Sequence, residues 1–363
     1  MFATSLSHIV EAPAVTGVYA GAETVLRFGP VAEELHTLRH GCGIFDLGWR
    51  GKLVVSGEDR VRWLNGMVSN NTRDLAQDFG NYSFVLDAKG RIQADLQAFQ
   101  RGEFYLLETE VSQIATLREY FDRYIVMDDV EIGDISLKLT SIGVAGPLTA
   151  QTLRSAGLMP SSHQANDGGP DELKPGQLAD GSWEGRGFTL VRDPVAVRNW
   201  HEIWLAPENA EAFWNRLLSA GASPVGAEAL EQQRILLGLP RIGVDIGARE
   251  LPQETGQSYA LHVAKGCYIG QEIVERIRAR GQVHRVFSGL LLEGPVASHG
   301  SKIMAGDKEA GEVTSCAEIV VDGMARRVAL GYLKRGSAEQ AESMHIDGHP
   351  AGIARLPFEF AAV

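Results

Sequence analysis

The chain has 363 residues, a net charge of -12 at pH 7, 44% hydrophobic residues and three cysteines. This length exceeds what one hydrophobic core usually serves, so we expect two or three domains. The acidic balance disfavours a general nucleic-acid-binding surface, because such binding depends on clustered cations. No apolar run is long enough for a membrane helix, and the N-terminus lacks a signal-peptide pattern, so we expect a cytoplasmic protein. The wide spacing of Cys42, Cys267 and Cys316 argues against a disulfide framework and a zinc motif, and three thiolates cannot form a four-thiolate iron-sulphur site.

The first 145 residues alternate strand patterns with helix patterns. A strand pattern at 51–56 is followed by a helix pattern that starts at Gly57. Three further strand patterns predict an antiparallel meander at 82–86, 91–99 and 103–108. The next helix pattern runs through Ile114, Leu117, Phe121 and Tyr124. A strand pair within 130–145 completes the order that is typical of an α+β domain with helices on one face of an antiparallel sheet.

The second half begins with a segment rich in proline and glycine at 159–187, which predicts a surface loop or linker. Strand patterns follow at 188–192 and 201–206, and two helix patterns run through Ala210–Leu218 and Ala229–Leu236. From Val286 onward, short strand patterns punctuated by glycine predict a small closed or nearly closed β barrel. His36 and His40 share a helix face, but without a third ligand pattern we interpret them as core or surface histidines.

The most unusual stretch is 265–285, KGCYIGQEIVERIRARGQVHR. Apolar residues at helical spacing predict a helix that starts at Gly270-Gln271 and ends at Gly281. Cys267 then lies just before the first turn, where backbone N–H groups, the helix dipole and nearby Lys265 favour a thiolate. The cations of this stretch, set against Glu272 and Glu275, leave a local charge of +3, and they are Lys265, Arg276, Arg278, Arg280 and Arg285. Such a patch suits a carboxylate-bearing or phosphorylated ligand, or an acidic partner surface.

A plain structural interpretation of this stretch stays open. Cys267 could be a small buried apolar residue, and the arginines could form a solvated helix face. The flanking glycines Gly266 and Gly270 favour a functional role, because they let the backbone approach a ligand closely.

The octapeptide Lys265-Gly266-Cys267-Tyr268-Ile269-Gly270-Gln271-Glu272, followed by Arg276, resembles the signature of the YgfZ family. That family comprises folate-binding proteins that support iron-sulphur proteins and certain tRNA modifications. It resembles in turn the T protein, the aminomethyltransferase of the glycine cleavage system. The resemblance implies an α+β fold, with two antiparallel-sheet subdomains around a central folate channel and a C-terminal β barrel. We therefore expect domains at 1–145, 146–285 and 286–363.

The resemblance also implies four folate contacts. Tyr82 borders the folate, and Asp95 faces its reactive end, with Ala94 in place of the first acid of the T-protein Asp-Asp pair. Glu202 matches the carboxylate that grips the amino-pyrimidine ring of the pterin, although the preceding Gly-Tyr-Thr-Gly-Glu run is missing. Arg234 lies at the position of an arginine near the folate in those proteins. Taken without the resemblance, Asp95 reads as a residue on the solvent face of a strand.

These features favour a tetrahydrofolate-binding accessory factor for iron-sulphur cluster assembly or repair, with Cys267 as the functional thiol. Its partners would be iron-sulphur clients or assembly proteins, including enzymes of tRNA modification, with no membrane and no direct nucleic-acid contact. Cys267 could ligate a transient cluster, attack a disulfide or act on a folate-borne one-carbon unit. The alternatives are a folate-dependent aminomethyl-type transferase and an RNA-binding factor in tRNA modification.

Overall fold

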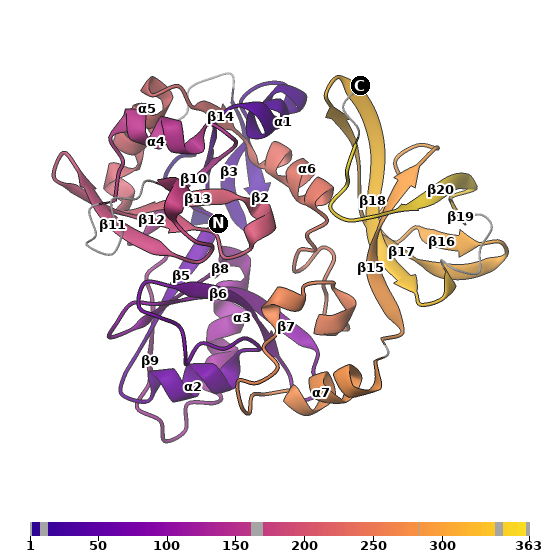
Figure 1. Cartoon of the computed structure of the whole chain (residues 1–363), viewed down its shortest axis with the longest axis horizontal. Coiled ribbons are helices and arrows are strands. Elements are labelled where there is room, and N and C mark those ends of the chain that lie inside the picture. The colour runs from indigo at the N-terminus through magenta and orange to yellow at the C-terminus, as the bar shows by residue number, and fades with distance from the viewer. Residues whose placement is uncertain (1, 8–13, 161–169, 282, 338–343, 361–363) are drawn as a thin grey trace. The chain divides into compact units, whose positions relative to one another are not determined.

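The computed structural model describes residues 2–7, 14–160, 170–281, 283–337 and 344–360. Its contacts divide the chain into two compact units, each of which combines two separate segments of sequence. The first unit comprises Met1–Ser83 and Leu96–Leu230, and the second comprises Phe84–Asp95 and Glu231–Val363. Figure 1 labels the elements of both units along the chain, from indigo at the N-terminus to yellow at the C-terminus.

A five-stranded sheet carries the predicted meander. Its strand order is β6(Gly80–Leu86), β7(Ile92–Gln100), β8(Tyr105–Glu110), β5(Arg50–Ser56) and β9(Glu131–Asp134). The helices α2(Arg60–Met67) and α3(Val111–Asp122) confirm the two predicted helices, and α3 packs against β5 and β8. Helix α3 buries one apolar face, because Ile114, Leu117 and Phe121 recur at helical spacing. The tip of the β6–β7 hairpin, Phe84–Asp95, belongs to the second unit.

A six-stranded sheet forms the other half of the first unit. Its order is β11(Leu178–Trp183), β12(Arg186–Arg192), β13(Trp200–Leu205), β10(Thr140–Ala145), β4(Gly43–Asp46) and β14(Ser223–Val225). All neighbours are antiparallel except β14, which runs parallel to β4 at the edge. The helices α4(Thr149–Ala156) and α5(Ala210–Ser219) lie together beside this sheet (Figure 1) and bury their apolar faces in its core.

Two sequence predictions in this region were wrong. The two strands predicted within 130–145 do not pair with each other, since β9 pairs with β5 and β10 pairs with β4 and β13. The predicted loop at 159–187 contains strand β11 and the first residues of β12. Strand β11, with the sequence LADGSW, lies at the edge of the sheet and buries only two of its residues. Its composition therefore resembles that of a loop. The part of this segment at 161–169 lies outside the described residues.

The sequence patterns did not identify the N-terminal strands, although they placed His36 and His40 on a helix. A small sheet forms from β1(Phe2–Ala3), β3(Ala22–Arg27) and β2(Val15–Tyr19). Helix α1(Val31–His40) follows, and it carries His36 and His40 as exposed neighbours with ring centroids 4.3 Å apart. The helix that leads out of the first unit is α6(Ala227–Leu237), which matches the predicted pattern through Ala229–Leu236.

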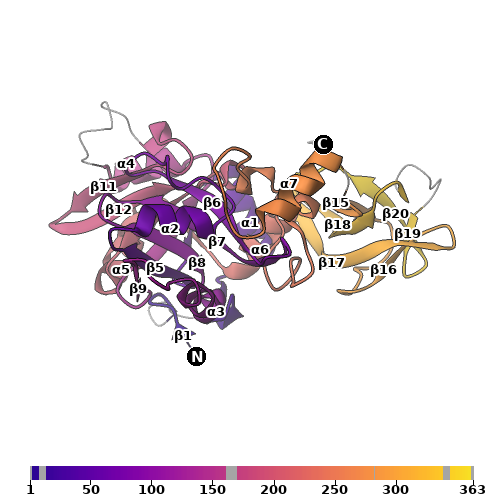
Figure 2. The ribbon, with the colours of Figure 1, turned by 90° about the horizontal axis from the view of Figure 1, so that it is seen from below.

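The second unit contains the predicted barrel, which is closed. Its strand order is β15(Arg285–Leu292), β18(Met324–Lys334), β17(Lys308–Val321), β16(Lys302–Ala305), β19(Met344–Ile346) and β20(His349–Ala354). Inward apolar side chains such as Leu290, Ile303 and Val313 form its core. Figure 2 shows these strands in orange and yellow. Helix α7(Gln271–Arg280) precedes the barrel and ends at Gly281 in a left-handed conformation, which confirms the predicted helix and its end.

The fold class expected from the sequence is confirmed, because α+β sheets are followed by a closed C-terminal barrel. The predicted boundaries after residues 145 and 285 do not coincide with the two compact units. β4 and β10 precede residue 146 but share a sheet with later strands, and α7 shares a unit with the barrel. The division into three domains stays a prediction.

Gly143 on β10 provides a test of packing between β10 and β4. A Cβ atom at this position would lie 1.9 Å from the fully buried ring of Phe45, whereas a Cβ at Gly133 on β9 would meet no atom within 4 Å. We expect Gly143→Ala to lower the free energy of unfolding by about 3 kcal/mol through overpacking. Gly133→Ala should change it by less than about 0.5 kcal/mol. Urea unfolding measures both variants, and equal effects would contradict the packing described here.

Candidate functional site

The first unit buries a group of four ionisable side chains between its two sheets. Lys52 on β5 and Glu108 on β8 face each other as a cross-strand pair, with 2.8 Å between Lys52 Nζ and Glu108 Oε1. Arg50 Nη2 lies 3.2 Å from the other oxygen of Glu108, and Arg50 Nε lies 4.0 Å from Oε1 of Glu202 on β13. Their side chains are 0–8% exposed, so these charges are shielded from solvent. We call these four residues the buried charge cluster.

Trp204 connects the cluster to a small apolar core to which both sheets contribute. It follows Glu202 by two residues on β13, so both side chains point to the same face. Its indole Nε1 donates to Oε2 of Glu202 at 3.0 Å, and the Lys52 ammonium lies 5.5 Å from the centre of its ring. The indole therefore fixes the orientation of Glu202 and contacts the cation that neutralises Glu108.

The two carboxyl groups of the cluster titrate in opposite directions. Burial, followed by repulsion from Glu108, raises the pKa of Glu202 to about 8. Burial also opposes ionisation of Glu108, but Arg50, Lys52 and a hydrogen bond from Glu202 outweigh it and lower the pKa of Glu108 to about 2. Oε1 of Glu202 and Oε2 of Glu108 accept no hydrogen bond from a described N–H group, which fits a proton shared by the two carboxyls. At neutral pH Glu202 is mostly protonated and Glu108 is ionised.

A second buried polar group surrounds Asp193, which is 1% exposed. Its carboxylate accepts hydrogen bonds from Trp200 Nε1 at 2.7 Å, from Arg198 Nη1 at 3.1 Å and from Gln97 Nε2 at 3.2 Å. The other side-chain atom of Gln97, Oε1, is buried and accepts no hydrogen bond from any described residue. A ligand N–H group could satisfy this buried acceptor.

The structure places the predicted folate contacts in both units. Tyr82 is buried on β6, and Glu202 is fully buried on β13, both in the first unit. Asp95 is half-buried on β7, on the strand face opposite to buried Ala94 and Leu96, and it belongs to the second unit. Arg234 belongs to the second unit as well. That all four contact one folate stays a prediction.

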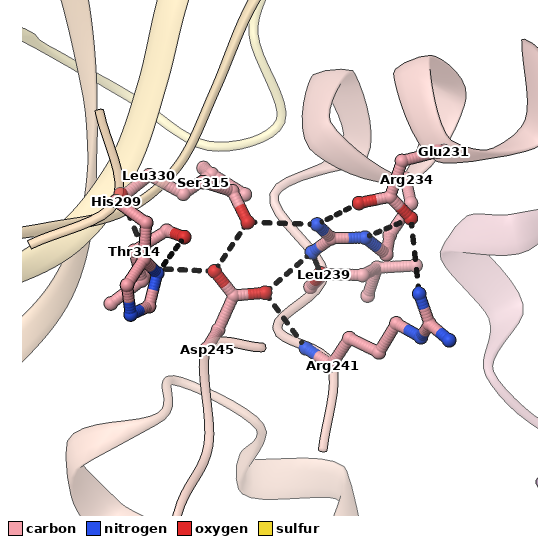
Figure 3. Close-up of polar contacts among 9 residues, drawn as sticks. All are labelled: Glu231, Arg234, Leu239, Arg241, Asp245, His299, Thr314, Ser315 and Leu330. Carbon is pink, nitrogen blue, oxygen red and sulfur yellow. Dashed lines mark hydrogen bonds and ion pairs between the residues drawn. The ribbon is translucent and has the colours of Figure 1, made fainter. Parts of the chain in front are cut away.

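Arg234 has partners within its own unit (Figure 3). Its Nη1 donates to the backbone oxygen of Leu239 and to Asp245 Oδ2, both at 2.6 Å, and its Nη2 donates to Ser315 Oγ at 2.9 Å. Asp245 also accepts hydrogen bonds from the hydroxyls of Thr314 and Ser315, where β17 has a register irregularity. Arg234 and Asp245 thus link helix α6 to the barrel, a structural role that the sequence did not indicate.

The segment before α7 keeps Cys267 accessible. Cys267 is exposed and lies four residues before the first residue of the helix. The amides of Gln271, Ile273 and Val274 donate to the backbone oxygens of Tyr268 and Gly270, so most of the first helical turn already has acceptors. That helix N–H groups stabilise the Cys267 sulphur stays a prediction, and three of the amides it would use already have backbone acceptors. The alternative of a buried, apolar Cys267 is wrong, because the residue is exposed.

Lys265 and Tyr268 form the buried part of this motif. The Lys265 side chain is largely buried, and its ammonium lies 4.8 Å from the centre of the Tyr268 ring. Burial, with a smaller effect of Glu275, raises the pKa of the Tyr268 hydroxyl to about 12, so this hydroxyl stays neutral. The two side chains anchor the motif, while the thiol between them faces solvent.

Sequence reasoning missed most of the buried charge cluster. Lys52 interrupts the apolar strand GKLVVS, and Glu108 interrupts YLLETE. A charged residue within an apolar strand was the available signal, because burying a charge is costly unless it is paired. The partners could not be identified, since residues 52 and 108 become neighbours only when β5 pairs with β8.

Comparison with known proteins agrees with this architecture. The structure of glycine cleavage system aminomethyltransferase T from Bartonella henselae has the same fold, with a TM-score of 0.84 at 21% identity and 98% of both chains covered. Residues 7–265 match the GCVT N-terminal domain family, so this chain belongs to that family. Aminomethyltransferases of Thermus thermophilus and Rubrobacter xylanophilus are each 26% identical over 94% of this chain, covering 93% and 89% of their own lengths. Among the described residues, no helix is long and apolar enough to cross a membrane.

The titration of Glu202 predicts a specific pH dependence of stability. Its pKa rises from 4.5 to about 8 on folding, so between these values the folded chain retains a proton that the unfolded chain has lost. The stability from this group is complete below pH 4.5 and is lost as the pH rises towards 8. The Glu202→Gln variant cannot lose this proton. We therefore expect the Tm difference, variant minus wild type, to be larger at pH 8.5 than at pH 5 by at least about 3 °C.

Thermal unfolding at several pH values measures this difference. Glu211→Gln, at an exposed position on α5, serves as the control and should follow the wild-type curve. Parallel curves for Glu202→Gln and wild type would contradict the protonated state assigned to Glu202.

Proposed function

We propose that this chain binds tetrahydrofolate or a one-carbon derivative of it, and transfers a one-carbon unit of the aminomethyl type. The observation that carries the proposal is the match of residues 7–265 to the GCVT N-terminal domain family. Relatives that span nearly the whole chain are named aminomethyltransferases. This agreement favours the transferase over the accessory factor that the motif around Cys267 suggests.

The buried polar groups of the first unit fit the pterin part of a folate. The amino-pyrimidine ring of a pterin presents neighbouring N–H donors, which need buried acceptors. Gln97 Oε1 is such an acceptor, and it has no donor among the described residues. The carboxylate of Glu202 is the second buried acceptor, once Glu202 has lost its proton. We propose that these two side chains and Tyr82 hold the pterin.

Protonation of Glu202 then controls folate binding. A protonated carboxyl offers one donor and one acceptor, whereas the ionised form offers two acceptors for a pair of N–H groups. Folate would replace the proton shared with Glu108, while Arg50 and Lys52 keep Glu108 ionised. The bound folate would supply the nitrogen that carries the one-carbon unit. Asp95 and Arg234 are proposed contacts on the second unit, with Arg234 already held by Asp245 and Glu231.

Calorimetric titration with 5-formyltetrahydrofolate tests this site. Only about one-tenth of a carboxyl with a pKa near 8 is ionised at pH 7, so we expect affinity to rise about tenfold from pH 7 to pH 9. Glu202→Gln should weaken binding at pH 9 by about 1–3 kcal/mol and remove the pH dependence. Glu211→Gln is the matched control with unchanged affinity. No binding by wild type, or the same pH dependence in Glu202→Gln, would contradict the proposed site.

An aminomethyl donor with tetrahydrofolate then tests the transfer step. The purified protein should form a one-carbon-substituted folate over many turnovers. Folate binding without any turnover would overturn the transferase and leave the second candidate.

The second candidate is an accessory factor for iron-sulphur cluster assembly or repair, including the clusters of tRNA-modifying enzymes. The observation that favours it is the exposed thiol of Cys267 within KGCYIGQE, the segment that resembles the YgfZ signature. An exposed thiol can ligate a cluster together with thiolates of a client protein. This candidate function requires no turnover of an aminomethyl donor, and it does not require helix N–H groups to bind the Cys267 sulphur.

Cys267→Ser separates the two candidates in cells. If the thiol meets client proteins, the variant should keep its folate affinity and Tm but lose rescue of a deletion strain. Cys316→Ser, in barrel strand β17, is the matched cysteine control and should rescue fully. Full rescue by Cys267→Ser would rule out a required thiol and with it the second candidate.

A further inference from the structure

The second unit contains a cavity of about 480 Å³ next to helix α7. It is formed by the turn of the β6–β7 hairpin, by the segment before the 3-10 helix Pro252–Glu254, by one side of α7, and by the residues 283–284 that follow this helix. Five of its ten lining residues are basic, and they are Lys89, Arg91, Arg249, Arg276 and His284. None of the described lining residues is acidic, although the chain as a whole has a net charge of -12. We call this space the basic cavity.

The four lysine and arginine side chains of the basic cavity form no ion pair within the described part of the chain. By contrast, Arg278, two residues after Arg276 on α7, pairs with Glu275 at 2.6 Å. Arg285 pairs with Glu250 at 2.7 Å and with Glu254 at 3.3 Å. The usual neutralisation of surface arginines in this unit therefore does not extend to the cavity, and its cations remain available to a ligand.

Two carboxylates that lie next to cavity cations in the sequence already accept other hydrogen bonds. Asp87 Oδ1 accepts hydrogen bonds from the amides of Lys89 and Arg91, at 2.8 Å and 2.9 Å, so this carboxylate caps the turn. Glu250 accepts from the amides of Gly247 and Arg249 as well as from Arg285. Both acids thus hold the backbone that carries the cations.

Glu312 and Glu272 are two further acids near cations of the cavity. Arg249 contributes to the lowered pKa of Glu312, after the Lys302 hydrogen bond, but Glu312 pairs at 2.7 Å with Lys302. Glu272 lies one helical turn before Arg276, and the two form no ion pair among the described residues. No carboxylate of a described residue therefore closes the basic cavity.

Hydrogen bonds join three of the four segments that line the cavity. The amide of Ile92 donates to the oxygen of Glu250 at 3.0 Å, which joins the hairpin to the middle segment. Gln253 Nε2 donates to the oxygen of Val274 at 2.9 Å, which joins that segment to α7. At the closest approach a Cβ on Gly270 would lie 2.6 Å from the oxygen of Asp87, so glycine is required there. The cations are preorganised around one space, which reduces the entropy cost of binding a ligand.

We propose that the basic cavity binds a small ligand with at least two anionic groups, which are phosphates or carboxylates. Its volume lies within the range typical of small-molecule sites. The strongly negative net charge opposes a long polyanion such as RNA, which needs cations over a broad face. None of Tyr82, Asp95, Glu202 and Arg234 lines this cavity, so the inference does not depend on the proposed folate site.

Calorimetric titrations with inorganic pyrophosphate and with citrate, at low ionic strength, test the site in the full chain. We expect at least one probe to bind, and the stronger of the two identifies the anionic group that the cavity prefers. The single variants Arg91→Ala and Arg276→Ala should each weaken binding by about tenfold or more, because each removes charge-assisted hydrogen bonds. Arg278→Ala removes the same charge from the same helix but outside the cavity, so its affinity should match wild type.

Raising the salt concentration to about 0.5 M should weaken binding to wild type, since exposed charges are screened. The inference is overturned if neither probe binds, or if Arg91→Ala and Arg276→Ala bind as tightly as Arg278→Ala. It is also overturned if a short RNA binds through these arginines while both small probes fail. Both cavity arginines are exposed, and an unchanged Tm shows that a loss of binding is not a loss of folding.

Discussion

The buried charge cluster is the constraint on which the first unit depends. Lys52, Arg50 and Glu108 come from the five-stranded sheet, and Glu202 comes from the six-stranded sheet. A buried charge without a partner costs several kcal/mol, so the two sheets pack well only when these side chains meet. The same burial raises the pKa of Glu202. At Glu108 this effect of burial is outweighed by Arg50 and Lys52, which lower the pKa and keep the carboxyl ionised. A structural requirement thereby creates a titratable group that suits the recognition of a ligand with N–H donors.

The second unit is held by contacts of a different kind. A buried carboxylate, Asp245, joins Arg234 of α6 to the hydroxyls of Thr314 and Ser315 on the barrel. Elsewhere in this unit, glycines at positions 90 and 270 let the hairpin turn approach the start of α7. The charges at the Asp245 contact neutralise each other, whereas the cations beside the hairpin turn and α7 form no ion pair among the described residues. The two proposed sites thus have opposite chemistry, since the folate site offers acceptors and the basic cavity offers donors.

Much of the local structure could be read from the sequence. The helical spacing from Ile269 to Ile277 and the stop at Gly281 predicted α7, and glycine-punctuated strand patterns predicted the barrel. Edge strands were missed, because β11 buries only two residues and carries no clear pattern. The basic character of the segment around α7 was evident, but among its described arginine side chains only Arg276 lines the cavity. Lys89, Arg91 and Arg249 come from segments that are distant in sequence.

By itself, the sequence determined the strands and helices with strong periodicity, the α+β class and the motif that carries Cys267. These properties depend on neighbouring residues and on backbone preference. Only the tertiary structure decided that Glu202 is paired with Glu108, that Arg234 binds Asp245 and that four cations surround one cavity. The reason is that burial, ion pairing and pKa depend on distances between residues far apart in the chain, and those distances exist only after the strands have paired.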